Sequence, residues 1–596
     1  MADVKTRDQI EAKYKWKLED MFSSDVAWEE KFAKAGEKVD AFGAYYGKLT
    51  ESVQSLLSAL KLLGEINLLV ESLYVYAKMR RDEDNNNDLY QGMTDRAMAL
   101  AVKCGGAVSF VGPQILEAPD GVVEDYIKNC EDLAPYAFGL QKILRMKAHT
   151  LSENEEKLLA ATGEMLQSPD TIFSMLTDAD MKHPVIKDEN GEDVEITHGR
   201  YIVLMESKNR EVRKASYDGL YGTYKSFSNT IAATYAANVK TEIFMADARK
   251  FPSTLDAALH ADSIPRSVYE SLIEAMHGGL DAMIEYMEIR KSLLGVDELK
   301  YYDLYVPLFE YEGDVTYEQA QQEITNGLLP LGERYKSDSA KAYSDGWTDV
   351  FESRGKSSGA YSWGHYGVHP YIMMNYQGTL DSMFTLAHEL GHAMHSFYSD
   401  GNNDYENAQY PIFLAEVAST TNEMLLIRYR IKNAASKEEK QYLLNYLLEQ
   451  FRTTMFRQTM FAEFEMKAHG AAQEGQALTP DFLRELYKEL NLTYYKNVAM
   501  DDNIPYEWSR IPHFYRAFYV YQYATGFAAA VKLSDDIYNA VPGAKEKYIE
   551  NFLSAGGKKD PIDILKDVGV DMTSPEVVAQ AIAFFRKTVE DLKATL

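Results

Sequence analysis

The stretch from Thr379 to Tyr398, TLDSMFTLAHELGHAMHSFY, decides how the rest of the chain is interpreted. Its apolar residues recur at spacings of three and four, which is typical of a helix with one buried face. Thr379 or Asp381 is a suitable N-cap, and the sequence at 399–401, Ser-Asp-Gly, is a suitable stop. The pattern predicts a helix of about five turns.

Two histidines four residues apart, His388 and His392, project from one side of that helix. Imidazoles so placed can approach one ion at about 2.0–2.1 Å, the usual distance from nitrogen to zinc. Glu389 lies about 100° around the helix from His388, so it stays off the ion but within reach of a water on it. In this His-Glu-x-x-His arrangement, zinc lowers the pKa of the water and the glutamate takes its proton. The competing interpretation is that both histidines are ordinary helix residues.

A hydrolytic zinc needs three protein ligands and one open position, so a third ligand must come from another segment. Glu416 is the best candidate, because it stands in the apolar run 413–418 of a predicted helix, where an acid must meet a cation or lose hydration at a cost of several kcal/mol. The alternative is a first-turn glutamate favoured by the helix dipole. Glu423, two turns further, is expected to accept a hydrogen bond from a ligating histidine, although a surface acid fits nearly as well. His395 is interpreted as a packing or supporting residue, because it lies about 4.5 Å beyond His392 along the axis.

Aromatic residues and a histidine gather near the C-terminus in RIPHFYRAFYVYQYATG, residues 510–526. Tyr515, Tyr519 and Tyr523 recur at four, which predicts one face of a helix. Peptide hydrolysis passes through a tetrahedral oxyanion, and phenols or an imidazole such as His513 donate hydrogen bonds to it without adding a fixed charge. The alternative is an aromatic stripe that belongs to the core.

Four stretches together resemble the oligoendopeptidase F branch of the thimet-oligopeptidase-like zinc peptidases. They are GKSSGAYSWG, HPYIMMNYQGTLDSMFTLAHELGHAMHS, FLAEVASTTNE and IPHFYRAFYVYQYATGF, and the similarity extends from about Leu133 to the C-terminus. The resemblance implies a mainly helical, prolate, two-lobed protein with a deep channel and a small β element near the active site. It also implies that the substrates are oligopeptides, because such a channel excludes folded proteins.

The resemblance also assigns roles to individual residues. It implies one zinc per chain, held by the residues that match the family's metal ligands, with the glutamate of the motif as general base. It further implies that a histidine and tyrosines after the Pro-His step assist the oxyanion. Carried over by position, the metal ligands are His388, His392 and Glu416, the base is Glu389, and the oxyanion residues are His513, Tyr515 and Tyr519.

The remaining sequence is mostly helical in pattern, so the predicted fold class is mainly α. Helices are expected over about 8–180, 210–295 and from 405 almost to the end. Residues 183–205, HPVIKDENGEDVEITHGRYIVLM, alternate β-branched and polar residues around Asn-Gly, which predicts a hairpin. We place a boundary there, between an N-terminal helical lobe at 1–185 and a catalytic region at 186–596.

A short strand is expected from His369 to Tyr376, directly before the metal helix. Its edge is expected to pair with an extended peptide and to lay one carbonyl against the metal. With helices walling a channel, the substrates are expected to be unstructured peptides of roughly five to twenty residues, at about 3.3 Å per residue.

Composition excludes several classes of function. The chain has 596 residues with 46% hydrophobic and 26% charged, which is typical of a globular protein. Its net charge of −29 opposes binding to nucleic acid or to an anionic membrane surface. Cys104 and Cys130 are its two cysteines, which favours a reducing compartment, the cytoplasm, over an exported protein. The polar first residues lack a signal sequence, and no run of about 18 apolar residues predicts a membrane span.

Two other functions remain open. A related zinc carboxypeptidase or dipeptidyl carboxypeptidase would need a basic group to hold a terminal carboxylate, and Arg510 or Arg516 could serve. A non-catalytic peptide-binding helical protein is the other alternative, against which the complete His-Glu-x-x-His motif and Glu416 both argue.

Overall fold

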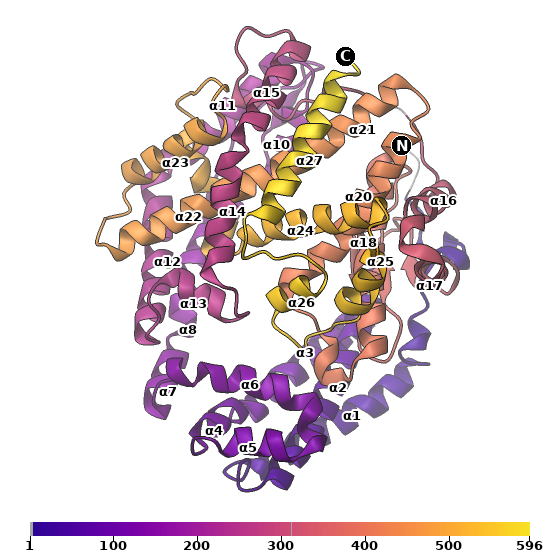
Figure 1. The fold of residues 1–596 in the computed structure, drawn as a ribbon, viewed down its shortest axis with the longest axis vertical. Coiled ribbons are helices and arrows are strands. Elements are labelled where there is room, and N and C mark those ends of the chain that lie inside the picture. Colours follow the sequence, from indigo (N-terminus) through magenta and orange to yellow (C-terminus); the bar gives the residue numbers. More distant parts are fainter. Residues whose placement is uncertain (1–3, 312) are drawn as a thin grey trace. The chain divides into compact units, whose positions relative to one another are not determined.

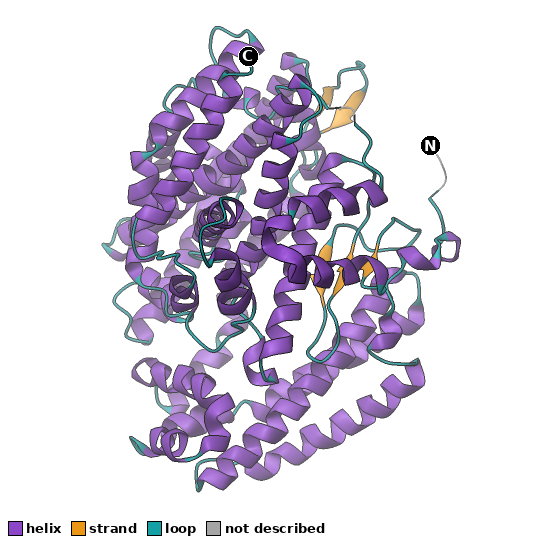
Figure 2. Ribbon diagram, turned by 45° about the vertical axis from the view of Figure 1, so that its right-hand side comes forward, coloured by secondary structure: helices purple, strands orange, loops and turns teal. Residues whose placement is uncertain are grey.

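The computed structural model describes residues 4–311 and 313–596, and most of them lie in helices, with strands confined to two small sheets (Figures 1 and 2). The predicted mainly α class is confirmed. Residues 1–3, which begin the polar N-terminal stretch, lie outside this description. The predicted division of the chain at residue 185 stays a prediction about where the catalytic region begins.

Internal contacts group the chain into two compact units, and each is built from three separate segments. Unit 1 comprises Met1–Ala148, Gly313–Arg430 and Leu533–Val570. Unit 2 comprises His149–Glu312, Ile431–Lys532 and Asp571–Leu596.

Unit 1 holds the first helices of the chain and the helices around the predicted metal site. Its helices, two of which cross a unit boundary, are α1 (Asp25–Phe42), α2 (Val53–Glu83), α3 (Asp88–Val108), α4 (Val111–Glu117), α5 (Val122–Asn129), α6 (Ala137–Arg145), α16 (Tyr317–Gly327), α17 (Gly332–Ser344), α18 (Leu380–Asn402), α19 (Tyr405–Ala408), α20 (Ile412–Lys432), α24 (Tyr521–Tyr538), α25 (Ala544–Lys547) and α26 (Pro561–Asp567). Residues 118–121, Ala-Pro-Asp-Gly, separate α4 from α5.

Helices α1, α2 and α3 pack against one another around a continuous apolar core. Two stretches here, Val53–Glu83 and Asp88–Glu117, are long and apolar enough to cross a membrane by length and composition alone. Of their most apolar windows, 33% and 22% are buried in the structure, and residues of both stretches, such as Leu56 and Leu100, belong to this core. The same core includes Tyr371 from the small sheet, so the N-terminal helices support the strands beside the predicted metal helix.

A three-stranded sheet in unit 1 consists of β3 (Thr348–Asp349), β4 (Tyr361–Trp363) and β5 (Tyr371–Met373), in the order β3-β5-β4. The strand predicted at 369–376 is β5, which is parallel to β3 and antiparallel to β4. Both of its edges are therefore occupied, and the expectation that this strand pairs with a substrate is wrong. In the strand order β3-β5-β4, strand β4 forms one edge of the sheet, and it packs against α18.

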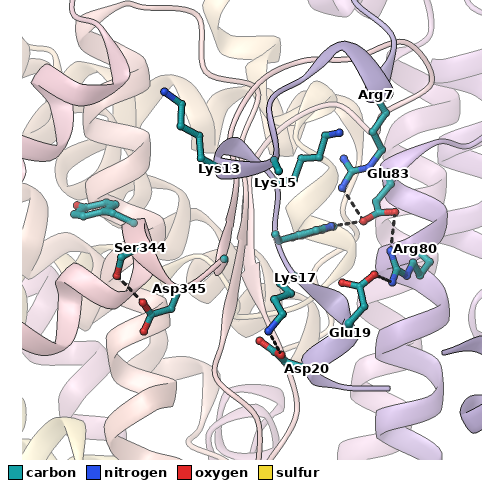
Figure 3. A pocket seen from close by; sticks show the side chains of 14 residues that line it. Arg7, Lys13, Lys15, Lys17, Glu19, Asp20, Arg80, Glu83, Ser344 and Asp345 are labelled. Atoms are coloured by element: carbon teal, nitrogen blue, oxygen red, sulfur yellow. Dashed lines mark hydrogen bonds and ion pairs between the residues drawn. The ribbon is translucent and has the colours of Figure 1, made fainter. Parts of the chain in front are cut away.

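The N-terminal segment of unit 1 is fixed to this sheet and to α2 by paired charges, which line a hollow of about 920 Å³ (Figure 3). Glu83 accepts hydrogen bonds from the Arg7 guanidinium and from the Trp16 indole. Arg80 pairs with Glu19 in the same hollow. Because these charges already have partners, the hollow is explained as an attachment of the N-terminal segment.

Unit 2 is helical apart from one hairpin. Its helices are α7 (Glu153–Ala161), α8 (Gly163–Leu166), α9 (Ser168–Ser174), α10 (His198–Met205), α11 (Arg210–Ser226), α12 (Ser228–Ala248), α13 (Thr254–His260), α14 (Arg266–Gly278), α15 (Leu280–Leu294), α21 (Lys437–Gln450), α22 (Arg457–Gln473), α23 (Pro480–Tyr494) and α27 (Glu576–Lys593). Prolines mark the starts of two of these helices: Pro169 lies in the first turn of α9, and Pro265 is the N-cap of α14.

The predicted hairpin is confirmed by β1 (Val185–Lys187) and β2 (Asp193–Glu195), which pair antiparallel across a turn with Gly191 at φ 80°. The second half of the predicted β stretch is a helix instead, α10. Its N-cap is Thr197, whose side chain accepts a hydrogen bond from the backbone of Arg200. A capping side chain therefore overrides the strand preference of the β-branched residues that follow.

Candidate metal centre

The helix that carries the motif is α18, Leu380–Asn402. Thr379 is its N-cap, as predicted, and the Thr379 hydroxyl accepts a hydrogen bond from a backbone N–H of the first turn. The helix runs past the stop expected at 399–401. The Asn403 side chain donates a hydrogen bond to the Ser399 carbonyl and so satisfies the last turn.

Helix α20 lies against α18 with backbone touching backbone. A Cβ atom at Gly391 would lie 2.5 Å from the Cα of Ser419 and 2.8 Å from the carbonyl oxygen of Ala418. Glycine is therefore required at 391, between the two histidines of the motif. The Asn422 side chain adds a hydrogen bond of 3.3 Å to the Ala387 carbonyl. This close approach places the predicted third ligand opposite the histidines.

His388, His392 and Glu416 come together in space, with their ligand atoms within 4.8 Å of one another. The two Nε2 atoms are 3.1 Å apart, and the Glu416 carboxylate lies 3.4 Å from His388 Nε2 and 3.8 Å from His392 Nε2. Ligands at about 2.0–2.1 Å in a tetrahedral site are separated from each other by about 3.4 Å. The three residues therefore fit a single metal ion of zinc's size.

The outer ring nitrogens of both histidines face acceptors, which leaves the inner nitrogens free to bind a cation. Glu423 Oε1 is 2.6 Å from His388 Nδ1, so the predicted supporting role of Glu423 is matched by a contact. Burial alone would lower the pKa of His388, but the hydrogen bond and charge of Glu423 raise it to about 9. Burial and the neighbouring His388 lower the pKa of His392 to about 3, against a small opposing effect of the Ala415 carbonyl. The charge of Glu423 therefore favours a positive charge at His388.

Glu389 is buried, with 8% of its surface exposed. Burial raises its pKa to about 7, although the charge of His388 and the backbone N–H of Ser362 in β4 lower it. A carboxylate whose pKa lies near neutrality is suited to take up and release a proton. Glu389 is the residue of the motif that this geometry leaves for acid–base work.

Glu416 lies at the candidate metal centre, but it is not buried there as its apolar neighbours in the sequence suggested. Its side chain is 45% exposed, because the apolar residues around it turn to the packed face of α20 and Glu416 does not. The predicted burial of Glu416 is therefore wrong, although its carboxylate does face the two histidines. The Ser419 hydroxyl donates a hydrogen bond of 3.2 Å that orients the Glu416 carboxylate.

His395 is a packing residue, as interpreted. It is fully buried, and its ring stacks on Tyr410 with centroids 3.6 Å apart and on Phe552 at 5.1 Å. Burial lowers its pKa to about 3, so the ring is neutral.

The C-terminal aromatic cluster belongs to unit 2, and its tyrosines do not share a helix face as predicted. Pro512–Tyr515 is a 3₁₀ turn, Phe518 has φ 55°, and α24 begins only afterwards. The Tyr515 hydroxyl is 2.6 Å from Thr234 Oγ1. Its ring stacks on Phe173, so Tyr515 is engaged inside unit 2.

Three other side chains of this segment lie close together and are exposed or partly exposed. His513 and Tyr519 lie nearly parallel, with centroids 6.3 Å apart, and Tyr523 meets both edge-on at 6.1 and 5.5 Å. His513 is exposed and the two tyrosines are partly exposed. The spacing of the tyrosines at intervals of four did not indicate this grouping, because it assumes a continuous helix. The left-handed backbone conformation at Phe518 interrupts that helix.

Replacing Gly391 by Ala is expected to destabilise the protein by about 1–3 kcal/mol and to weaken metal binding, because the new methyl group forces α18 and α20 apart. Gly401→Ala is the matched control on the same helix: nothing lies within 4 Å of its Cβ position, so it is expected to be neutral or stabilising by up to about 1 kcal/mol. Urea unfolding and metal content measure both effects. Equal behaviour of the two variants would show that the helix contact does not control the site.

A mainly helical fold in which one helix supplies two histidines and a buried glutamate, and a second helix supplies a carboxylate, defines a metallopeptidase. Comparison with known families gives the branch. Residues 203–584 match the model of Peptidase family M3, and residues 114–183 match that of Oligopeptidase F. The chain belongs to peptidase family M3, as the sequence resemblance indicated, and it is an oligopeptide-cleaving metallopeptidase.

Individual relatives agree with that assignment over nearly the whole chain. The chain is 43% identical over 592 residues to oligopeptidase PepF of Bacillus subtilis, covering 99% of this chain and 88% of that relative. It is 40% identical to group B oligopeptidase PepB of Streptococcus agalactiae, covering 98% of each. A crystal structure of a peptidase from Chlamydophila abortus matches with TM-score 0.94 at 34% identity, over 100% of both chains. That of oligoendopeptidase F from Enterococcus faecium matches with TM-score 0.74 at 35% identity, covering 96% of this chain and 99% of that one.

Proposed function

We propose that this protein is a zinc-dependent endopeptidase that hydrolyses internal bonds of short, unstructured oligopeptides. The observation that carries the proposal is the triangle of His388, His392 and Glu416 with the buried Glu389 beside it. Its edges of 3.1, 3.4 and 3.8 Å suit one zinc ion per chain. The oligopeptidase names of the relatives support the substrate class.

Zinc in such a site would act as a Lewis acid that polarises the peptide carbonyl and activates a water at neutral pH. Glu389 accepts the proton of that water and passes it to the leaving amine, a shuttle that its position and buried environment favour. Glu423 holds His388 in the tautomer whose Nε2 is free. The outer edge of β4, beside Glu389, offers backbone groups to an extended peptide.

We assign the stabilisation of the oxyanion to the segment that contains His513, Tyr515 and Tyr519. Tyr523 is included because its ring contacts those of His513 and Tyr519. Tyr515 uses its hydroxyl proton on Thr234, whose own hydroxyl donates to the Ile231 carbonyl, so its role is to hold the segment. The exposed or partly exposed donors of this segment are His513, Tyr519 and Tyr523.

Tyr519→Phe is expected to lower kcat by about 10²–10³-fold with little change in KM, because a donor to the oxyanion acts only in the transition state. Tyr515→Phe is the matched control and is expected to change stability more than kcat. Steady-state kinetics on one capped peptide and thermal melts separate the two effects. A Tyr519→Phe enzyme with normal kcat would move the role to Tyr523 or His513.

Peptides blocked at both ends and graded from five to twenty residues test the endopeptidase activity, with cut sites located by mass spectrometry. We expect internal cleavage of the blocked peptides that stops with a chelator and returns with zinc. Trimming of unblocked peptides from one end alone would favour the exopeptidase alternative, for which Arg516, exposed and 4.1 Å from the Tyr519 ring, is a candidate group. Absence of any cleavage would favour the peptide-binding alternative.

An unfolded protein of a few hundred residues tests the channel, which is part of the same proposal. If helices enclose the site, this long chain is cut far more slowly than the peptides. Efficient cutting at many internal positions would remove the channel from the proposal and leave the metal chemistry intact. A cytoplasmic location completes the proposal and is consistent with the two free thiols, Cys104 and Cys130.

A further inference from the structure

A small cavity of about 190 Å³ lies in unit 1 and is not used by the chemistry above. It is smaller than the usual pocket for a free small ligand, which is about 300 Å³ or more, and suits a single side chain. We call it the acidic pocket. Its charged and aromatic lining residues are Glu71, Trp363, His365, Tyr366, Asp400 and Tyr410.

The acidic pocket is next to the metal centre. His392, Ser396 and Asp400 follow one another at intervals of four on α18, so they share one face of that helix, and the last two line the pocket. Asp400 is therefore about 12 Å from His392 along the helix axis. The opposite wall begins with Ser362, the residue of β4 whose N–H faces Glu389. A peptide lying along the edge of β4 would pass this opening.

The two carboxylates of the acidic pocket lack a cation. Glu71 accepts hydrogen bonds from the Tyr405 hydroxyl and the Gln409 amide, at 3.2 and 3.3 Å. Among residues 4–311 and 313–596, no Lys, Arg or His pairs with Glu71 or Asp400. Burial raises the pKa of Glu71, and burial together with the charge of Glu71 raises the pKa of Asp400 to about 7. By contrast, Glu19, Asp20 and Glu83 in the hollow of Figure 3 are each paired with a base.

His365, which lines the acidic pocket, adds no positive charge to it, because burial lowers the pKa of its ring. His365 Nδ1 lies 2.9 Å from the Tyr366 carbonyl, so this nitrogen carries the ring proton and Nε2 is left as an acceptor. In the described structure Nε2 is buried and has no partner.

Aromatic rings complete the walls. Trp363, Tyr366 and Tyr410 line the pocket, and aromatic rings of this kind can attract a cation and pack against an aliphatic stem. His395 stacks behind Tyr410, and the Tyr410 hydroxyl is 2.9 Å from Ser396 Oγ, so this wall is rigid. Carboxylates at one end and aromatic rings along the sides suit a long side chain that ends in a positive charge.

We propose that the acidic pocket is a specificity subsite that binds a Lys or Arg side chain of the peptide substrate. The position of the cut bond relative to it rests on the proposed function. At about 3.3 Å per residue, the distance of about 12 Å along α18 places the bound side chain roughly three to four residues from the cut bond. A free N-terminal amine has the same charge and is the other source of a cation that the pocket would accept.

The test uses a set of nine-residue peptides, blocked at both ends, that carry one Lys at successive positions, and the same set with norleucine in place of Lys. Norleucine keeps the aliphatic stem and removes the charge. We expect kcat/KM to be about ten- to a hundredfold higher for Lys at one position only, since a buried charge-assisted hydrogen bond is made there. Versions with a free N-terminal amine and no Lys report on the alternative cation.

Asp400→Asn and Glu71→Gln are expected to bring the ratio of Lys to norleucine close to one at that position. The ratio is taken within each enzyme, so a general loss of turnover cancels. Asp381→Asn is the matched control, because it removes one exposed carboxylate from the first turn of the same helix, and its ratio is expected to equal that of the native enzyme.

Two outcomes overturn the proposal: a ratio near one at every position in the native enzyme, or a ratio that both pocket variants retain. Either can occur while the norleucine peptides are still cleaved, so the proposed function would stand. If no peptide is cleaved at all, the proposed function fails, and calorimetry with the same peptide pairs on Glu389→Gln protein still gives the ratio. Preference for the free amine over Lys would overturn the side-chain subsite.

Discussion

Replacing Glu389 by Gln is expected to lower kcat by about 10²–10⁴-fold while the fold and the metal remain. The amide has the shape of the carboxylate but takes up no proton near neutral pH, so only the proton shuttle is lost. Glu389 is buried and is not one of the three clustered ligand residues, and exchanging it therefore leaves the donor set complete.

Three measurements separate this effect from damage to the site: metal analysis, thermal melting and hydrolysis of a blocked peptide. Glu423→Gln is the matched comparison, because it makes the same chemical change behind His388 rather than at the water. It is expected to weaken metal binding or activity by about 10–100-fold, with activity partly restored by added zinc. Zinc does not restore Glu389→Gln. Normal hydrolysis by Glu389→Gln would remove this residue from the mechanism.

Replacing Glu416 by Ala is expected to abolish stoichiometric zinc and, with it, nearly all turnover. Two imidazoles 3.1 Å apart remain, but a hydrolytic zinc is held by three protein ligands. Because Glu416 is 45% exposed and lies off the packed face of α20, the change removes a ligand without opening a cavity in the core.

Zinc content after dialysis and kcat/KM across a range of added zinc measure this loss. Glu416→Asp serves as the conservative variant: it keeps the charge on a shorter stem and is expected to bind zinc more weakly than the native protein and more tightly than Glu416→Ala. If Glu416→Ala protein keeps one zinc per chain with full activity, the third ligand is another residue.

The sequence predicted those parts of the site that depend on local geometry. The spacing of His388 and His392 on a helix with a threonine cap follows from helical periodicity, and α18 has both features. The sequence indicates Glu416 as the third ligand because a hydrolytic metal needs a third protein donor. The expected burial of its side chain is wrong. Periodicity reports which residues share a face and does not report which face is packed.

The features that the sequence did not predict depend on contacts between distant segments. Pairing of β5 on both sides depends on β3 and β4, and the separation of Tyr515 from Tyr519 depends on a backbone reversal at Phe518. Each compact unit combines three stretches of chain, which no local pattern encodes. The requirement for Gly391 had a visible signal, a glycine inside a strong helix pattern, where this residue ordinarily weakens the helix by about 1 kcal/mol.

The contact at Gly391 also bears on how the protein exchanges its metal. Helices α18 and α20 meet backbone to backbone at this glycine. The packing of the polypeptide therefore sets the distance between the ligand residues on the two helices, and no ion is needed to bring the helices together. The site is then preorganised, so the helices that carry its three ligand residues are expected to stay folded without an ion. A zinc finger, by contrast, unfolds when its metal is removed. Removing and restoring the proposed ion is therefore expected to leave the packing of α18 against α20 unchanged.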